Sequence, residues 1–129
     1  MNRFAIGTCT TLAAAALALG AGTASAKGGD RFVRVAGTCS PGVTAKLKAK
    51  NDGSVIEAEF EVDQNRNGVR WNWRLLRGGV VVRRGVSTTH APSGSFSVDR
   101  RIANPAGVNR VTFRAVSSSG KTCRATLRV

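Results

Sequence analysis

The chain has 129 residues, and its 20 lysines and arginines outnumber 7 aspartates and glutamates, which gives a formal net charge of +13 at pH 7. This length suffices for one domain of ordinary size and excludes two. An excess of positive charge favours an anionic partner such as nucleic acid, wall polymer, acidic polysaccharide or anionic lipid. The same charge can also serve solubility alone, so charge by itself names no partner.

Residues 1–26 read as a secretory signal peptide. Arg3 supplies a positive start, an alanine-leucine core runs over residues 12–19, and Ala24-Ser25-Ala26 forms an A-x-A cleavage site. The apolar core is too short for a membrane anchor. We therefore predict a mature domain over residues 27–129 that is secreted, extracellular or cell-wall associated, and has no transmembrane segment. Loss of Arg3 leaves 19 basic against 7 acidic side chains, a net charge of +12.

Two cysteines, Cys39 and Cys123, remain after cleavage. In an oxidising compartment an even pair predicts one disulfide. It would close most of the mature chain into a loop, and the chain-entropy account then assigns it about 4 to 5 kcal/mol. Two free thiols or a zinc site are weaker alternatives, because only His90 could add a metal ligand. We expect no metal and no cofactor.

Apolar and polar residues alternate along the mature chain, and turn signals recur about every ten residues. This pattern predicts an all-β fold, a single sandwich of about seven or eight antiparallel strands. The predicted strands are 31–38, 43–50, 55–62, 69–77, 80–86, 95–102, 109–117 and 122–128.

The clearest predicted hairpin lies in KLKAKNDGSVIEAEFEV. A type I′ turn at Asp52-Gly53 sets its register, with Lys48 opposite Glu57 and Lys46 opposite Glu59. The lysines and glutamates then share the outer face, and the alanine, leucine, isoleucine and phenylalanine side chains share the inner one. This half of the surface is expected to be charge-balanced.

A second hairpin, WNWRLLRGGVVVRR, turns on Gly78-Gly79 and places Arg74 opposite Arg83. Trp71 and Trp73 point to the same side of their strand. Exposed, such a pair could stack on sugars or bases. Burial in the core, as for the strand-C tryptophan of a sandwich, is the favoured interpretation for at least one of them.

The tryptophan strand WNWRLLRGG, a short strand and a terminal hairpin together resemble strands C, C′, F and G of immunoglobulin-like or fibronectin-type sandwiches. The resemblance implies a fold and carries no functional motif. The cysteines depart from it, because Cys39 ends the first strand and Cys123 begins the last, whereas the immunoglobulin disulfide joins strands B and F. The stretches VAGTCSPG, KLKAK, EFEVDQNRNG, TTHAPSGSF and RRIANPAG also resemble a group of small secreted actinobacterial proteins, which implies a secreted single domain.

In that topology strands C, C′, F and G share one sheet, whose outer face collects basic and polar side chains with no acid among them. These candidate binding residues are Arg70, Asn72, Arg74, Arg83, Arg110, Arg114, Arg124 and Arg128. Planar guanidinium groups bind phosphate, sulfate and carboxylate in a bidentate manner. The leading hypothesis is a secreted, non-enzymatic module that binds anionic polymers. The alternative is a basic face that is only solvated.

The sequence offers no catalytic constellation. His90 stands in STTHAPSGS without a G-x-S-x-G elbow, and no carboxylate pair suits glycoside hydrolysis. An enzyme is not expected. A protein-interaction or proteinase-inhibitor module with a secreted protein partner is the alternative function, acting through loop 87–94 or loop 103–108.

The stretch DQNRNG at residues 63–68 begins like a calcium-binding loop, with oxygen-bearing side chains at Asp63, Asn65 and Asn67. An EF-hand loop requires a bidentate acid at its twelfth position, where this chain has Arg74. We interpret the stretch as a hairpin-like connection whose Asn and Gly residues tolerate positive φ. A shorter metal site on the same three side chains is the alternative.

Overall fold

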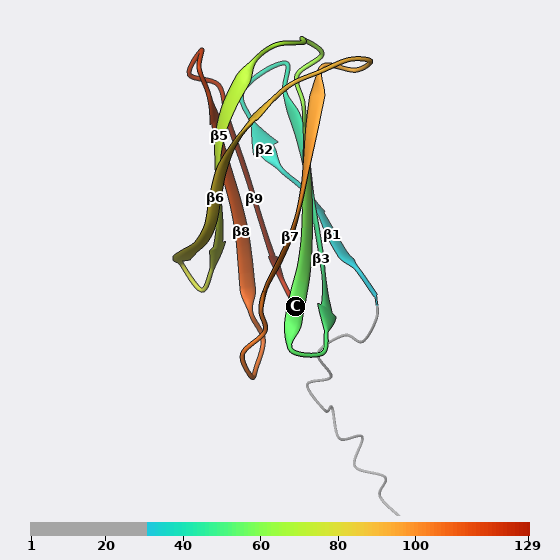
Figure 1. Cartoon of the computed structure of the whole chain (residues 1–129), viewed down its shortest axis with the longest axis vertical. Helices are drawn as coiled ribbons and strands as arrows, with labels where there is room; N and C mark the ends of the chain where they lie inside the picture. The colour runs from blue at the N-terminus through green and yellow to red at the C-terminus, as the bar shows by residue number, and fades with distance from the viewer. Residues whose placement is uncertain (1–30) are drawn as a thin grey trace, which may run out of the picture.

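The computed structural model describes residues 31–129, which form two antiparallel sheets packed face to face (Figure 1). The predicted signal peptide and its cleavage site lie outside these residues. The described strands are β1 (Val33–Ala36), β2 (Thr38–Cys39), β3 (Thr44–Asp52), β4 (Val55–Asp63), β5 (Arg70–Arg77), β6 (Val80–Thr88), β7 (Ser95–Ala103), β8 (Arg110–Ser117) and β9 (Thr122–Arg128). The predicted all-β sandwich is confirmed.

The order of strands in each sheet is that of an immunoglobulin-like sandwich. The five-stranded sheet runs β2-β9-β8-β5-β6, and the four-stranded sheet runs β1-β3-β4-β7. Strands β9-β8-β5-β6 therefore have the G-F-C-C′ order that the tryptophan strand predicted, and β3-β4-β7 have the order A-B-E. The short strands β1 and β2 are additions at the edges of the two sheets.

The predicted first strand, 31–38, is divided in two because the chain changes sheets at Gly37. The Gly37 amide donates to the Ala45 carbonyl at 2.7 Å, and a Cβ on Gly37 would lie 2.9 Å from the Ala45 Cβ. Only glycine fits this crossing without displacement. The crossing brings Cys39 of β2 opposite Cys123 of β9, and the predicted disulfide joins them with a Cα–Cα distance of 4.1 Å.

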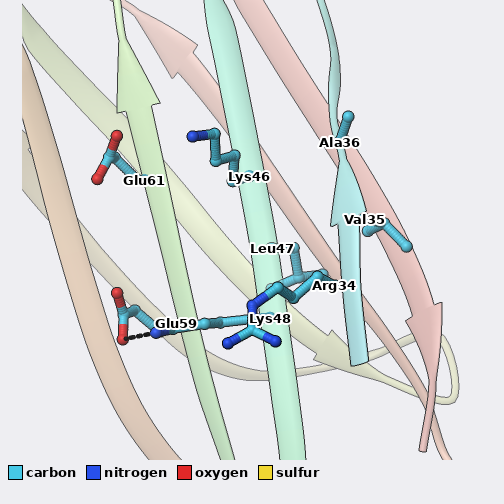
Figure 2. A pocket seen from close by; sticks show the side chains of 8 residues that line it. All are labelled: Arg34, Val35, Ala36, Lys46, Leu47, Lys48, Glu59 and Glu61. Atoms are coloured by element: carbon cyan, nitrogen blue, oxygen red, sulfur yellow. Dashed lines mark ion pairs between the residues drawn. The ribbon is translucent and has the colours of Figure 1, made fainter. Parts of the chain in front are cut away.

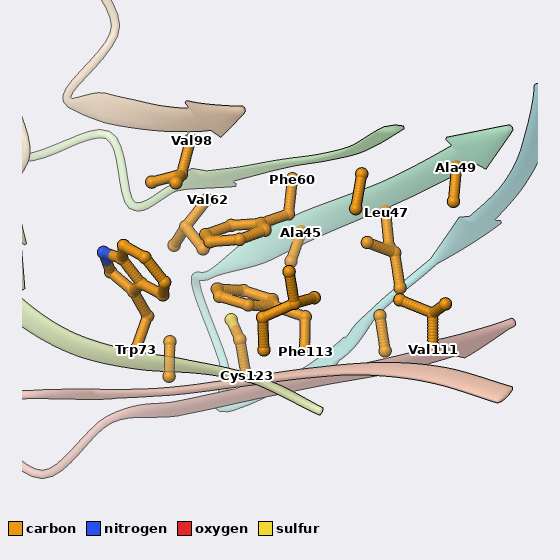
Figure 3. Packing of buried hydrophobic residues seen from close by; sticks show 14 of the residues in the cluster. Ala45, Leu47, Ala49, Phe60, Val62, Trp73, Val98, Val111, Phe113 and Cys123 are labelled. Carbon is orange, nitrogen blue, oxygen red and sulfur yellow. The ribbon is translucent and has the colours of Figure 1, made fainter. Parts of the chain in front are cut away.

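The core lies between the sheets and is centred on aromatic side chains (Figure 3). Phe60 of β4 and Phe113 of β8 stack across the interface with ring centroids 3.5 Å apart. Trp73 meets Phe60 edge-on at 5.3 Å. These contacts between the sheets fix which face of each strand is buried, and so also which face reaches solvent.

Both tryptophans belong to the core, which confirms the favoured interpretation. Trp71 is 0% and Trp73 is 2% exposed. Their indole N–H groups are satisfied inside the sandwich: Trp71 Nε1 donates to Gln64 Oε1 and Trp73 Nε1 to Ser87 Oγ, both at 3.1 Å. Neither ring is available to stack on a ligand.

The first hairpin forms with a register two residues away from the prediction. Asp52 pairs with Val55, and the loop is Gly53-Ser54 with Gly53 at φ 61°. Glycine with positive φ at the first loop position fits a type II′ turn and not the type I′ turn expected at Asp52-Gly53. A shift of two preserves the faces of both strands. The predicted pairs Lys48–Glu57 and Lys46–Glu59 are replaced by Lys48–Glu59, Lys50–Glu57 and Lys46–Glu61.

Candidate functional site

The outer surface of the five-stranded sheet carries seven exposed arginines, which we call the arginine face. They are Arg70, Arg74, Arg84, Arg110, Arg114, Arg124 and Arg128. Asn72 is exposed on the same surface, next to Arg74 along β5. The structure therefore brings together every predicted candidate residue except Arg83, and adds Arg84.

Strand pairing places four of these arginines in one row. Arg84 of β6 lies opposite Arg74 of β5, and Arg74 lies opposite Arg114 of β8. Arg114 in turn lies opposite Arg124 of β9. Neighbouring strands are about 4.8 Å apart and directly opposite residues point to the same side, so the row spans about 14 Å. Four cationic side chains thus project from the same face of the sheet in one line across its strands.

Arg83 was wrongly placed on this surface because β6 contains a bulge. Leu76 pairs with Val81, whereas Leu75 pairs with Arg83. The extra residue, Val82, inverts the alternation beyond it, so Arg83 shares the inner side of its strand with buried Leu75. Its Nη2 donates to the carbonyl of Arg101 in β7 at 3.2 Å. Arg83 therefore covers an edge strand of the other sheet.

Gly85 is the feature that the sequence reasoning missed. It lies opposite Trp73, and a Cβ at this position would come within 2.4 Å of the Trp73 ring. A strand residue without a side chain is where a large ring from a neighbour can cross. Gly85 must therefore face inward, which turns Arg84 outward; the tryptophan–glycine match was the available signal.

The two outer surfaces of the sandwich differ in charge. Among residues 31–129, all Asp and Glu side chains belong to the four-stranded sheet: Asp52, Glu57, Glu59, Glu61, Asp63 and Asp99. Figure 2 shows Lys48 paired with Glu59 there, at 3.1 Å, beside Arg34, Lys46 and Glu61. The depression that these residues line, of about 480 Å³, thus mixes three basic with two acidic side chains. The described part of the chain places no Asp or Glu side chain on the arginine face.

Asp99 is the carboxylate of the four-stranded sheet whose pKa is shifted. It lies opposite Glu59 in the pairing of β4 with β7. Partial burial raises the pKa of Asp99, and repulsion from Glu59 raises it further, while Lys48 acts in the opposite direction. The two carboxylates share their surroundings and compete for the same lysine.

The DQNRNG stretch connects the two sheets and is not hairpin-like, because β4 and β5 belong to different sheets. Asn65 has φ 53° and Gly68 has φ 77°, as expected for these residue types. Asp63 Oδ1 accepts a hydrogen bond from the Asn65 backbone amide at 2.9 Å. No group of three or more His, Cys, Asp or Glu side chains in the described part of the chain could hold a metal ion.

The two candidate loops are both fastened to the domain. In loop 87–94, the Thr89 hydroxyl accepts the Val69 amide at 2.9 Å and donates to the Arg66 carbonyl. Loop 103–108 is held by the Asn109 side-chain amide, which reaches the Pro105 carbonyl at 2.9 Å. His90, beside Thr89, has one ring contact, 3.4 Å from the Thr88 carbonyl.

No protein-family model matches the chain, and neither does any curated protein sequence. Within residues 31–129, no helix is long and apolar enough to cross a bilayer.

Proposed function

We propose that the mature domain is exported and acts as a non-enzymatic module that binds extracellular polyanions through the arginine face. Wall polymers, acidic polysaccharides and nucleic acid are the ligand classes that suit it. The observation that carries the proposal is the row Arg84–Arg74–Arg114–Arg124, on a surface to which the described residues contribute no Asp or Glu side chain.

Such a row works against folding. Like charges directly opposite on neighbouring strands are destabilising, whereas opposite charges there stabilise by about 0.2 to 1 kcal/mol per pair. The other sheet of the same domain offsets its like-charge contacts with cross-strand ion pairs, as in Lys48–Glu59 and Lys50–Glu57. Within residues 31–129, the acids therefore all belong to one sheet and the other sheet has none. A polyanion laid along the row would relieve the repulsion.

The shape of the face suits an extended ligand. The row crosses four strands, and further arginines lie above and below it at Arg70, Arg110 and Arg128. Guanidinium groups bind oxyanions with two parallel hydrogen bonds. If four anionic groups of duplex DNA are neutralised, counterion release gives a slope of about −3.6 in a plot of log affinity against log salt.

Export is supported by separate observations. The Cys39–Cys123 disulfide suits an oxidising compartment. Residues 1–26 have the pattern of a signal peptide, and the sequence resembles small secreted actinobacterial proteins. We propose an extracellular or wall-associated location on these grounds.

The test is salt-dependent retention of residues 27–129 on immobilised heparin and DNA. The R74E/R114E variant reverses the two central charges of the row and should lose retention at low salt. R34E/R66E reverses the same number of charges elsewhere, because Arg34 lies in β1 and Arg66 in the loop that follows β4. This control should lose only the smaller part that depends on net charge. Equal losses in both variants would contradict a role for the face, as would unchanged retention in R74E/R114E.

A second candidate, a protein-binding or proteinase-inhibiting loop, is favoured by the geometry of loop 103–108. Besides the Pro105 carbonyl, Asn109 Nδ2 contacts Asn104 Oδ1 at 3.1 Å and the Gly107 carbonyl at 3.3 Å. The loop presents Val108, which is 60% exposed. A rigid loop with an exposed apolar residue is what a partner recognises. Salt-insensitive capture of a secreted protein, lost in V108D, would favour this candidate.

A further inference from the structure

The arginine face is hollowed at one end. A depression of about 250 Å³ lies there, lined by three arginines, Arg110, Arg114 and Arg124, and by Leu76, Thr112 and Thr126. The space per water in the liquid is about 30 Å³, so the depression has room for a tetrahedral oxyanion together with a few waters or part of a sugar ring. Arg74 and Arg84, although on the same face, do not line it.

The floor of the depression is almost inaccessible to solvent. Leu76 and Thr112 point outward from the sheet, since Thr112 alternates with buried Val111 and Phe113, yet both are only 6% exposed. The lining arginines carry apolar stems of the kind that cover such surface. A low-dielectric floor strengthens the attraction between the guanidinium groups and an anion seated on it.

A pair of threonine hydroxyls at the depression adds a hydrogen-bond donor for an anion. Thr112 Oγ1 and Thr126 Oγ1 lie 3.1 Å apart, so one hydroxyl donates to the other. A threonine hydroxyl has one hydrogen and two acceptor lone pairs. The accepting hydroxyl therefore keeps its own hydrogen for a further partner, and a ligand oxygen above the pair can take it.

The backbone brings the three arginines together. Arg114 lies opposite Arg124, and Arg110 lies two rows beyond on the same side of β8, with the Thr112–Thr126 row between them. The Arg110 carbonyl accepts the Gly78 amide at 2.9 Å, and a Cβ on Gly79 would lie 3.5 Å from Arg110 Nη2. The Arg110 guanidinium thus rests against the β5–β6 turn at the rim of the depression.

We infer that this depression is a discrete site for a phosphate or sulfate group, bound by Arg110, Arg114, Arg124 and the Thr112–Thr126 hydroxyl pair. The inference rests on the proposed function and deepens it by naming the anionic group. Three cations and a hydroxyl match a tetrahedral oxyanion with three or four acceptor oxygens. A carboxylate, which is planar and singly charged, uses fewer of these donors and binds more weakly here.

The test compares two variants that remove the same charge from the same face. R110Q/R124Q removes two of the three arginines that line the depression, and R74Q/R84Q removes two arginines of the row that lie outside it. Inorganic phosphate and sulfate are titrated at constant ionic strength, with chloride as the reference ion, and binding is followed by amide chemical shifts. Phosphate should shift the amides around Thr112 and Thr126 in the unaltered protein and in R74Q/R84Q. Its affinity should fall at least tenfold in R110Q/R124Q.

The outcomes separate this inference from the proposed function. Equal loss of phosphate binding in both variants, or no response to phosphate in the unaltered protein, overturns the discrete site even if retention on heparin and DNA persists. Failure of the unaltered protein to bind either polymer overturns the proposed function, whatever phosphate does. Heparin or DNA retention that falls more in R110Q/R124Q than in R74Q/R84Q assigns the site to polymer-borne groups. Equal polymer losses with selective loss of phosphate assign it to the free ion.

Discussion

Arg74 lies directly opposite Arg114 at the middle of the five-stranded sheet, and Arg84 flanks Arg74 on the other side. No Asp or Glu side chain shares their surface within residues 31–129. A cationic side chain is thus held between two others on neighbouring strands. The repulsion among these arginines lowers the stability of the fold, while the same charges favour binding of a polyanion. Folding stability and polyanion binding can be measured separately.

Replacing Arg74 with glutamate should stabilise the domain while it weakens polyanion binding. The new carboxylate would face an arginine on each side, so two repulsive pairs become attractive, a gain of about 0.5 to 1 kcal/mol at low salt. The gain should shrink at high ionic strength. Urea unfolding at two salt concentrations measures it. R66E has the same change in net charge without two facing arginines, and an equal gain in that variant would contradict the explanation.

Alanine at Gly85 should destabilise the domain, because the added Cβ would meet the Trp73 ring at 2.4 Å. Overpacking of this kind costs about 1 to 3 kcal/mol. Chemical denaturation of G85A measures the loss, and V86A, at an exposed neighbouring position, should change stability by about 0.5 kcal/mol or less.

A double-mutant cycle identifies the cause of that loss. The smaller ring of W73F should accept the alanine, so G85A should cost less in W73F than in the unaltered protein. Equal costs in the two backgrounds would show that the Trp73 ring is not what excludes a side chain at position 85.

Gly85 also shows where prediction from the alternation of apolar and polar residues fails. Alternation predicted the sandwich, the buried tryptophans and most of the arginine face, because period two assigns every residue of a regular strand to a face. It placed Arg83 and not Arg84 on that face, since a bulge inverts the period and leaves no mark in local composition. The Gly37 crossing was missed for a related reason: the clash with Ala45 that requires glycine is made by a different strand.

The first hairpin shows a second limit. Asp52-Gly53 identified the turn, but a shift of two residues conserves both faces, so hydrophobic patterning could not choose between the two registers. The depression over Leu76 could not be predicted from the sequence at all. It depends on side chains from β5, β8 and β9, whose neighbourhood only the folded sheet defines.

Removing the disulfide should cost much of the stability of the domain. Cys39 and Cys123 are 84 residues apart in sequence, and on the chain-entropy account a loop of this length gives about 4 to 5 kcal/mol. Urea unfolding of C39A/C123A measures the loss, and the unaltered protein under reducing conditions should lose a similar amount. A much smaller loss in both would show that the unlinked chain keeps its terminal strands together while unfolded.

Replacing Asp99 with asparagine should stabilise the domain near neutral pH and have little effect in acid. Burial and Glu59 raise the pKa of Asp99, so the folded state holds its proton more tightly than the unfolded state does. Stability from this group is therefore complete at low pH and is lost as pH rises through the folded pKa. Asparagine removes that loss. The resulting gain in the free energy of unfolding should be about 0.5 kcal/mol or less, because the side chain is largely exposed to solvent. Thermal unfolding of D99N from acid to neutral pH should show the gain appear as pH increases. E61Q removes an acid that lies opposite Lys46 and should show no such gain, and a D99N gain independent of pH would exclude the carboxylate repulsion as its cause.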